Sequence, residues 1–204
     1  MSTDVTTLHV SPLTETWAFA DTIQGVNLAL ASDGGWLAVR SQEREDKLTL
    51  LPVQSQGETW VVPSRSEETY SFIVDNIAWS PDGSRLAFTG FSWEVGEMIH
   101  IVDVRAHLEW NIPVYMGNRI RFAHFLSWPP DGNALMFAAR NENTRKDNLY
   151  VVNVDGSNLR NLSRDEDLYV RAPTWSPDGH YVFYSEYSDQ DFTRRPRLIE
   201  VTSR

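Results

Sequence analysis

The 204-residue sequence predicts an all-β fold built from repeated four-stranded antiparallel sheets. Asp-Gly pairs recur with a nearly constant spacing of 49, 49 and 47 residues, and a short apolar run of β-forming residues follows each pair at the same offset. The sequence shows no amphipathic helical pattern that could cover a sheet. Four-stranded sheets that repeat without helices can bury their faces only on one another, so the pattern predicts the blades of a β-propeller. The pairs are Asp33-Gly34, Asp82-Gly83, Asp131-Gly132 and Asp178-Gly179.

Each unit is expected to contain four strands, which we name a to d from the inside of the propeller outward. Strand a ends just before the Asp-Gly turn, and strand b is the apolar run after it, for example "RLAF" at 85–88. Strand c follows a polar loop, and strand d follows one further turn. The predicted domain is a single propeller with these parts: strands c and d of a partial blade at 7–20, and blades at 25–63, 70–114, 119–163 and 168–204, the last without its outer strand.

The pentapeptide "WSPDG" at 79–83 and 175–179, with the variant "WPPDG" at 128–132, is predicted to join strands a and b. Proline fits the second position of a type I turn because its φ is fixed, Asp fits the third, and Gly supplies a positive φ at the fourth. The Trp that precedes the turn is predicted to fill the space between neighbouring blades. The residues given this structural role are Pro81, Asp82, Gly83, Asp131, Gly132, Pro177, Asp178 and Gly179.

These turns, together with "NLYVVNVDGSNLRNLS" at 148–163, resemble the Pro-Asp propeller repeats of the TolB-like family, which are similar to WD repeats. The resemblance covers residues 25–204. It implies a β-propeller of the kind used for protein binding or attached as a domain to an enzyme. It implies no catalytic residue, because the family motif is itself structural.

The predicted strand order is cd, abcd, abcd, abcd, abc, and two arrangements are compatible with it. In one, residues 15–20 lie beside 198–201 as an outer strand and close a four-bladed ring, which leaves 8–13 as a surplus strand. In the other, which we favour, the chain is a slice of a six- to eight-bladed propeller. The further blades then come from the same or another chain, since an exposed blade face forfeits apolar burial.

Composition excludes several functional classes. A net charge of −10 disfavours nucleic acid as a partner, and no apolar run approaches the roughly 20 residues of a membrane-spanning helix. The first residues lack the features of a signal peptide, so a cytoplasmic location is expected for the sequence as written, and a periplasmic or extracellular one if the N-terminus is truncated.

No cofactor, metal site or catalytic residue is expected. Cysteine is absent, and the five histidines have no metal-ligand spacing. The segment 153–158 resembles part of a calcium loop, but a tight hairpin explains its Asp-Gly pair more simply. Nucleophile-elbow, dinucleotide and P-loop motifs are absent as well.

The loops from b to c and from d to a share one face of a propeller, and here that face is rich in arginine and aromatic residues, the types enriched at binding hot spots. We expect a protein or peptide partner to bind there. An alternative interpretation is that the aromatic residues fill gaps between blades and the arginines pair with nearby acids. The candidate partner-binding residues are Phe91, Trp93, Arg119, Arg121, His124, Arg140, Arg145, Arg171, Tyr187, Phe192, Arg194 and Arg195.

Three functions are compatible with these features. The favoured one is a non-catalytic scaffold for protein–protein interaction. The second is the propeller segment of a prolyl-oligopeptidase-like peptidase whose catalytic domain lies outside this chain. The third is a propeller enzyme that acts at the channel mouth, for instance on sugars, through His124, Asp75 or Arg171.

Overall fold

The computed structural model describes residues 25–41, 48–53, 58–62, 72–92, 96–114, 120–141, 145–163, 169–187 and 192–201. These residues form four antiparallel sheets, in which the strands are hydrogen-bonded in chain order. The predicted all-β architecture of propeller blades is therefore confirmed. The partial blade predicted at 7–20, including the segment 15–20 that would close a ring, lies outside the described residues. None of the described residues belongs to a helix capable of spanning a membrane.

We number the sheets as blades 1 to 4. Blade 1 contains β1 (Gly25–Leu30), β2 (Trp36–Ser41), β3 (Leu48–Pro52) and β4 (Trp60–Val62). Blade 2 contains β5 (Phe72–Trp79), β6 (Arg85–Ser92), β7 (Gly96–Asp103) and β8 (Leu108–Pro113). Blade 3 contains β9 (Ile120–Ser127), β10 (Ala134–Asn141), β11 (Lys146–Asn153) and β12 (Arg160–Asn161). Blade 4 contains β13 (Tyr169–Trp175), β14 (Tyr181–Tyr187) and β15 (Arg194–Glu200).

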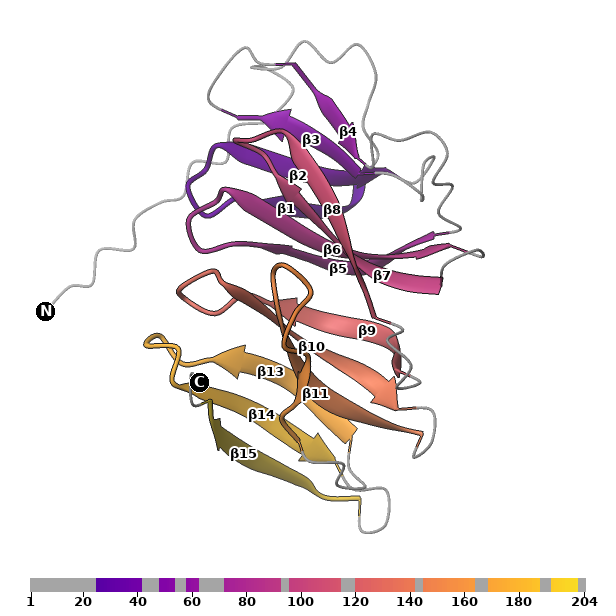
Figure 1. The fold of residues 1–204 in the computed structure, drawn as a ribbon, viewed down its shortest axis with the longest axis vertical. Coiled ribbons are helices and arrows are strands. Elements are labelled where there is room, and N and C mark those ends of the chain that lie inside the picture. Colours follow the sequence, from indigo (N-terminus) through magenta and orange to yellow (C-terminus); the bar gives the residue numbers. More distant parts are fainter. Residues whose placement is uncertain are drawn as a thin grey trace, which may run out of the picture.

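The described blades are stacked face to face, with blade 1 and blade 4 at opposite ends of the stack (Figure 1). Three apolar clusters fill the spaces between consecutive blades, and they are centred on Phe88, Phe137 and Met136. The strands of blades 2 and 3 are buried on both faces because each lies between two neighbours. By contrast, Phe183 and Leu198 of blade 4 are 47% and 54% exposed on the outer face of the stack.

The turn between strands a and b has the same geometry in each blade. In blade 2, the amide of Gly83 donates a 3.0 Å hydrogen bond to the carbonyl oxygen of Ser80, and Gly83 has a φ of 69°. The Asp82 carboxylate accepts hydrogen bonds from the hydroxyls of Ser80 and Ser84. These contacts satisfy the polar groups of a turn that packs against the preceding blade, where the Ser32 hydroxyl donates to the carbonyl of Ser80.

The Trp before the turn also connects blades. The indole N–H of Trp79 donates to the carbonyl oxygen of Ala29 at 2.8 Å, and that of Trp128 donates to Ala78 at 2.9 Å. In both pairs the acceptor is in strand a of the preceding blade. The tryptophan therefore fills the space between two sheets and also donates a hydrogen bond across it.

Candidate functional site

Polar and aromatic side chains from blades 3 and 4 meet where strand b ends and strands a and c begin. The strand pairing places Tyr169 opposite Tyr187, and Tyr187 opposite Arg194. In blade 3, Arg140 is opposite both Arg121 and Asp147. We call the central group the strand-end cluster, and it consists of His124, Lys146, Asp147, Tyr169, Arg171 and Tyr187.

Asp147 is the centre of this cluster. Its side chain is 14% exposed, and one carboxylate oxygen accepts a 2.7 Å hydrogen bond from Nη1 of Arg171 in blade 4. Nε2 of His124, on β9 of the same blade, is 3.9 Å from the same oxygen. Because Asp147 is in blade 3, the ion pair with Arg171 joins two blades and orients the guanidinium, which also donates to the carbonyl of Val170.

Tyr169 supplies an aromatic surface beside this ion pair. The ammonium nitrogen of Lys146 is 4.3 Å from the ring centroid of Tyr169, and the guanidinium carbon of Arg171 is 5.6 Å from it. These are distances at which a cation is attracted to the face of an aromatic ring. The ring of Tyr187 is 6.2 Å away, centroid to centroid. The cluster thus presents two cations and two phenols at one edge of the blades.

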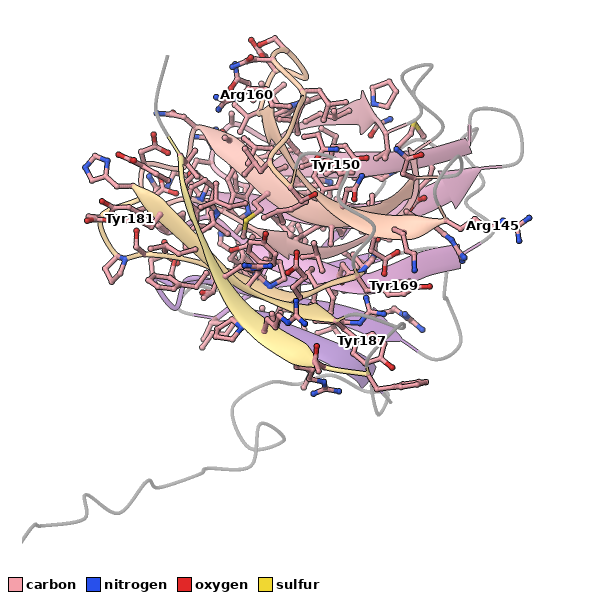
Figure 2. All side chains as sticks on the ribbon, turned by 90° about the horizontal axis from the view of Figure 1, so that it is seen from below. Arg145, Tyr150, Arg160, Tyr169, Tyr181 and Tyr187 are labelled. Carbon is pink, nitrogen blue, oxygen red and sulfur yellow. The ribbon has the colours of Figure 1, made fainter. Side chains whose placement is uncertain are left out.

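Further basic residues surround the cluster. Arg140, Arg145 and Arg194 are exposed, and Arg145 has a φ of 58° in the turn that begins β11. Phe192, also at a positive φ, is 77% exposed. Arg145, Tyr169 and Tyr187 lie on the same side of the molecule in Figure 2. Within the described residues, exposed basic side chains therefore border the cluster, although the chain carries a net charge of −10.

The structure brings together only part of the predicted site. His124, Arg171 and Tyr187 are in the cluster, and Arg140, Arg145, Phe192, Arg194 and Arg195 lie along the same strand ends. Trp93 and Arg119 lie outside the described residues, and Phe91 and Arg121 are described only by their places in β6 and β9.

His124 is part of strand a of blade 3. It lies within β9, opposite Ala138, next to an irregular pairing between β9 and β10. Phe125, the next residue, has a φ of 56°, and its amide donates to the side-chain oxygen of Asn76 in blade 2. This bulge turns the histidine toward Asp147, and a pattern of alternating residues does not reveal such a bulge.

Lys146, Asp147 and Tyr169 were not singled out from the sequence. Each is the first or second residue of strand a or c, so its position along the strand could have indicated the same edge as the predicted arginines. The contact of Tyr169 with Lys146 depends on how two blades pack, and no short-range sequence signal reports that.

The geometry suits recognition of an acidic group. Exposed guanidinium groups donate in pairs to a carboxylate or phosphate, and the phenols offer hydroxyl groups and flat apolar surface. Within the part of the chain that the structure describes, no three His, Asp or Glu side chains are grouped as metal ligands would be. The Asp155 carboxylate in the segment 153–158 accepts from the amide and hydroxyl of Ser157, as in a tight turn.

Solved structures with the same fold include proteins of different activity. An oligogalacturonate lyase from Vibrio parahaemolyticus shares 16% identity with a TM-score of 0.62, over 85% of this chain and 49% of that one. The Swd1 propeller domain from Myceliophteria thermophila shares 16% with a TM-score of 0.51, over 83% and 58%. A putative TolB from Agrobacterium tumefaciens shares 17% with a TM-score of 0.48, over 85% and 76%.

The chain thus spans about half the length of the lyase and somewhat more of the Swd1 domain. At these identities, the likeness establishes a propeller fold and nothing about activity. No protein-family model matches the sequence, and no curated protein matches it.

Proposed function

We propose that this protein is a non-catalytic β-propeller module, built from TolB-type Pro-Asp repeats, that binds an acidic segment of a partner protein. The binding surface is the strand-end cluster with the arginines beside it. The observation that carries the proposal is the ion pair between Arg171 and Asp147, because it joins blades 3 and 4 and holds one guanidinium beside the Tyr169 ring.

Preorganisation supports a binding role for this edge. Side chains held by β-strands and by contacts between blades lose little freedom when a partner binds. Within the strand-end cluster itself, the carboxylate of Asp147 lies beside the two cations Lys146 and Arg171, and an acidic peptide would complement that excess of positive charge. Propellers that bind proteins are among the structural relatives, since the Mitotic Checkpoint Complex matches this chain with a TM-score of 0.59 and 18% identity.

The proposal is tested with an array of 12-residue peptides of graded charge, probed with the 204-residue chain. Acidic peptides that bind are then measured by fluorescence anisotropy against Arg171→Ala, Tyr169→Ala and Tyr169→Phe. We expect binding to weaken about tenfold with Arg171→Ala and Tyr169→Ala, and to persist with Tyr169→Phe, which retains the ring.

The matched control is Arg105→Ala, which removes an exposed arginine at the opposite ends of the strands. It should leave the affinity of acidic peptides unchanged. Retention of full affinity by both Arg171→Ala and Tyr169→Ala, or equal binding of neutral and acidic peptides, would overturn the proposal.

A further inference from the structure

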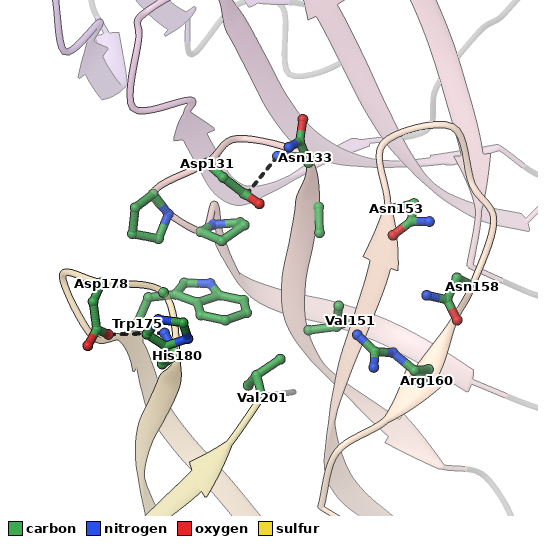
Figure 3. Close-up of a pocket in the computed structure, with 14 residues that line it drawn as sticks. Asp131, Asn133, Val151, Asn153, Asn158, Arg160, Trp175, Asp178, His180 and Val201 are labelled. Carbon is green, nitrogen blue, oxygen red and sulfur yellow. Dashed lines mark hydrogen bonds between the residues drawn. The ribbon is translucent and has the colours of Figure 1, made fainter. Parts of the chain in front are cut away.

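A pocket of about 290 Å³ lies between blades 3 and 4 at the strand ends opposite the strand-end cluster. Pro130 and Val151 line it from blade 3, and Trp175 and Val201 line it from blade 4 (Figure 3). Arg160, in β12, points toward Val151 and also lines the pocket (Figure 3). Residues of two neighbouring blades thus form the pocket.

Arg160 occupies a position that tryptophan fills in blades 1 and 2. Strand pairing shows that Trp60, Trp110 and Arg160 are equivalent, because each lies opposite the residue at the corresponding position of strand c in its own blade. The pairs are Leu50 with Trp60, Ile101 with Trp110, and Val151 with Arg160. A residue that is large and apolar in two blades is therefore cationic in the third.

A tryptophan at this position contacts the following blade, and an arginine does not reproduce that contact. The indole N–H of Trp110 donates a 2.8 Å hydrogen bond to the carbonyl oxygen of Val154, at the corner after strand c of blade 3. Val201 follows strand c of blade 4 in the same way, and it lines the pocket. The Arg160 side chain has neither an ion pair nor a hydrogen bond among the described residues, and its Nε is buried.

A second donor at the pocket also lacks a partner. Trp79 and Trp128 each donate an indole N–H to strand a of the preceding blade. Nε1 of Trp175, the equivalent residue of blade 4, is buried and has no hydrogen-bond partner within the described part of the chain. The indole ring of Trp175 lines the pocket while its N–H is covered by protein atoms, so the donors that a ligand in the pocket could reach are the terminal nitrogens of Arg160.

We propose that this pocket binds a carboxylate carried on a short apolar body. The terminal nitrogens of the Arg160 guanidinium are paired donors for the two carboxylate oxygens, and the Trp175 ring forms one wall of the site. Val151, Val201 and Pro130 supply apolar walls for the body of the ligand.

The two acidic side chains at the pocket do not compete for Arg160. The Asp131 carboxylate accepts the amide of Asn133, and the Asp178 carboxylate accepts the hydroxyl of Ser176 and the amide of His180. Both belong to the a–b turns, whereas Arg160 approaches from β12 on the other side of the pocket (Figure 3). His180 is exposed at the rim.

Such a carboxylate is found at the C-terminus of a peptide and in a free carboxylic acid. The test titrates the ¹⁵N-labelled 204-residue chain with Gly-Gly-Leu, with its C-terminal amide, and with 4-methylpentanoate. The indole N–H signals of the eight tryptophans are observed, and the signal that Trp175→Phe removes is assigned to Trp175. We expect the carboxylates to shift that signal, because the Trp175 ring lines the pocket, and the amide to leave it unchanged.

Binding to the peptide but not to the free acid would assign the site to a peptide terminus, and equal binding would assign it to a small acid. Arg160→Gln should weaken binding about tenfold or more, because it removes a charged donor. Arg160→Trp should fill the pocket, abolish binding and raise the melting temperature. Unchanged indole signals from the other tryptophans will show that Arg160→Gln is folded.

Equal shifts with carboxylate and amide, or an unchanged affinity in Arg160→Gln, would overturn the proposal. Arg171→Ala is the matched control, since it alters the strand-end cluster at the other ends of the strands. It should bind Gly-Gly-Leu as the unaltered chain does, so this site and the proposed protein-binding surface can fail independently.

Discussion

The indole N–H of Trp79 donates a 2.8 Å hydrogen bond to the carbonyl oxygen of Ala29, fifty residues earlier in the chain and in the neighbouring blade. Trp128 and Ala78 repeat this contact one blade further along. Trp175 has the same place in blade 4 and lacks the bond. The spaces between blades are therefore not equivalent, although the turns that border them are.

This difference predicts unequal effects of one substitution. Trp79 and Trp175 are both half-buried, so Trp→Phe removes similar volume at either site. We expect Trp79→Phe to lower the free energy of unfolding by about 1–2 kcal/mol more than Trp175→Phe, because only Trp79 loses a hydrogen bond. Urea unfolding followed by circular dichroism measures both, and equal losses would contradict the expectation.

A side chain added at Gly83 should clash at the contact between blades 1 and 2. A Cβ atom there would be 2.5 Å from the carboxyl carbon of Asp33, and the φ of 69° strains any L-residue. We expect Gly83→Ala to cost about 2–3 kcal/mol in unfolding free energy, of which about 1–2 kcal/mol is backbone strain. Gly96→Ala is the matched control, since φ is also positive and no atom lies within 4 Å. A cost no larger for Gly83→Ala than for Gly96→Ala would exclude the clash.

The lowered pKa of Asp82 leads us to expect that the protein loses stability in acid. Hydrogen bonds from the hydroxyls of Ser80 and Ser84 lower the pKa of Asp82 from 3.8 to about 2. A carboxylate whose pKa is lower in the folded state stabilises the fold above its unfolded pKa. Its contribution should therefore be complete above about pH 4 and be lost as the pH falls from 3.8 through about 2.

The measurement for Asp82 is the free energy of unfolding as a function of pH, compared with Asp82→Asn. The two proteins should differ most at neutral pH and converge in that acid range. A difference that stays constant down to pH 2 would show that ionisation of Asp82 does not support the turn.

Because Trp110 and Arg160 occupy equivalent positions, we can predict the effect of placing an arginine at position 110 in blade 2. Trp110→Arg should open a space between blades 2 and 3 and leave the carbonyl of Val154 without its donor. We expect the free energy of unfolding to fall by about 2–4 kcal/mol, as for other large losses of buried aromatic volume. A thermal denaturation scan provides the measurement, and an unchanged melting temperature would show that tryptophan is not required at this position.

The repeat was predictable because its determinants are local. Pro81 has a fixed φ, Gly83 tolerates a positive one, and alternating apolar residues mark the strands that follow. Each of these properties acts within a few residues of the chain. The arginines at 140, 145 and 171 could also be assigned to one edge, because position along a strand determines which edge a residue occupies.

The remaining features of both sites depend on contacts between blades. Lys146 and Tyr169 meet because β11 and β13 pack together, and His124 turns toward Asp147 because β9 is bulged. These residues are distant in the chain or are displaced by an irregular register. No regular pattern of residues encodes either relationship.

The sequence alone determined the repeated antiparallel blade and its turns, since short-range backbone preferences and alternating burial are enough to specify them. The tertiary structure alone decided which donors between blades find acceptors. Trp79, Trp128 and Trp175 are the same residue type at the same position of the repeat, and the last lacks the bond of the other two. Whether a hydrogen bond forms there depends on the distance and angle between two sheets, which are set by all the side chains packed between them.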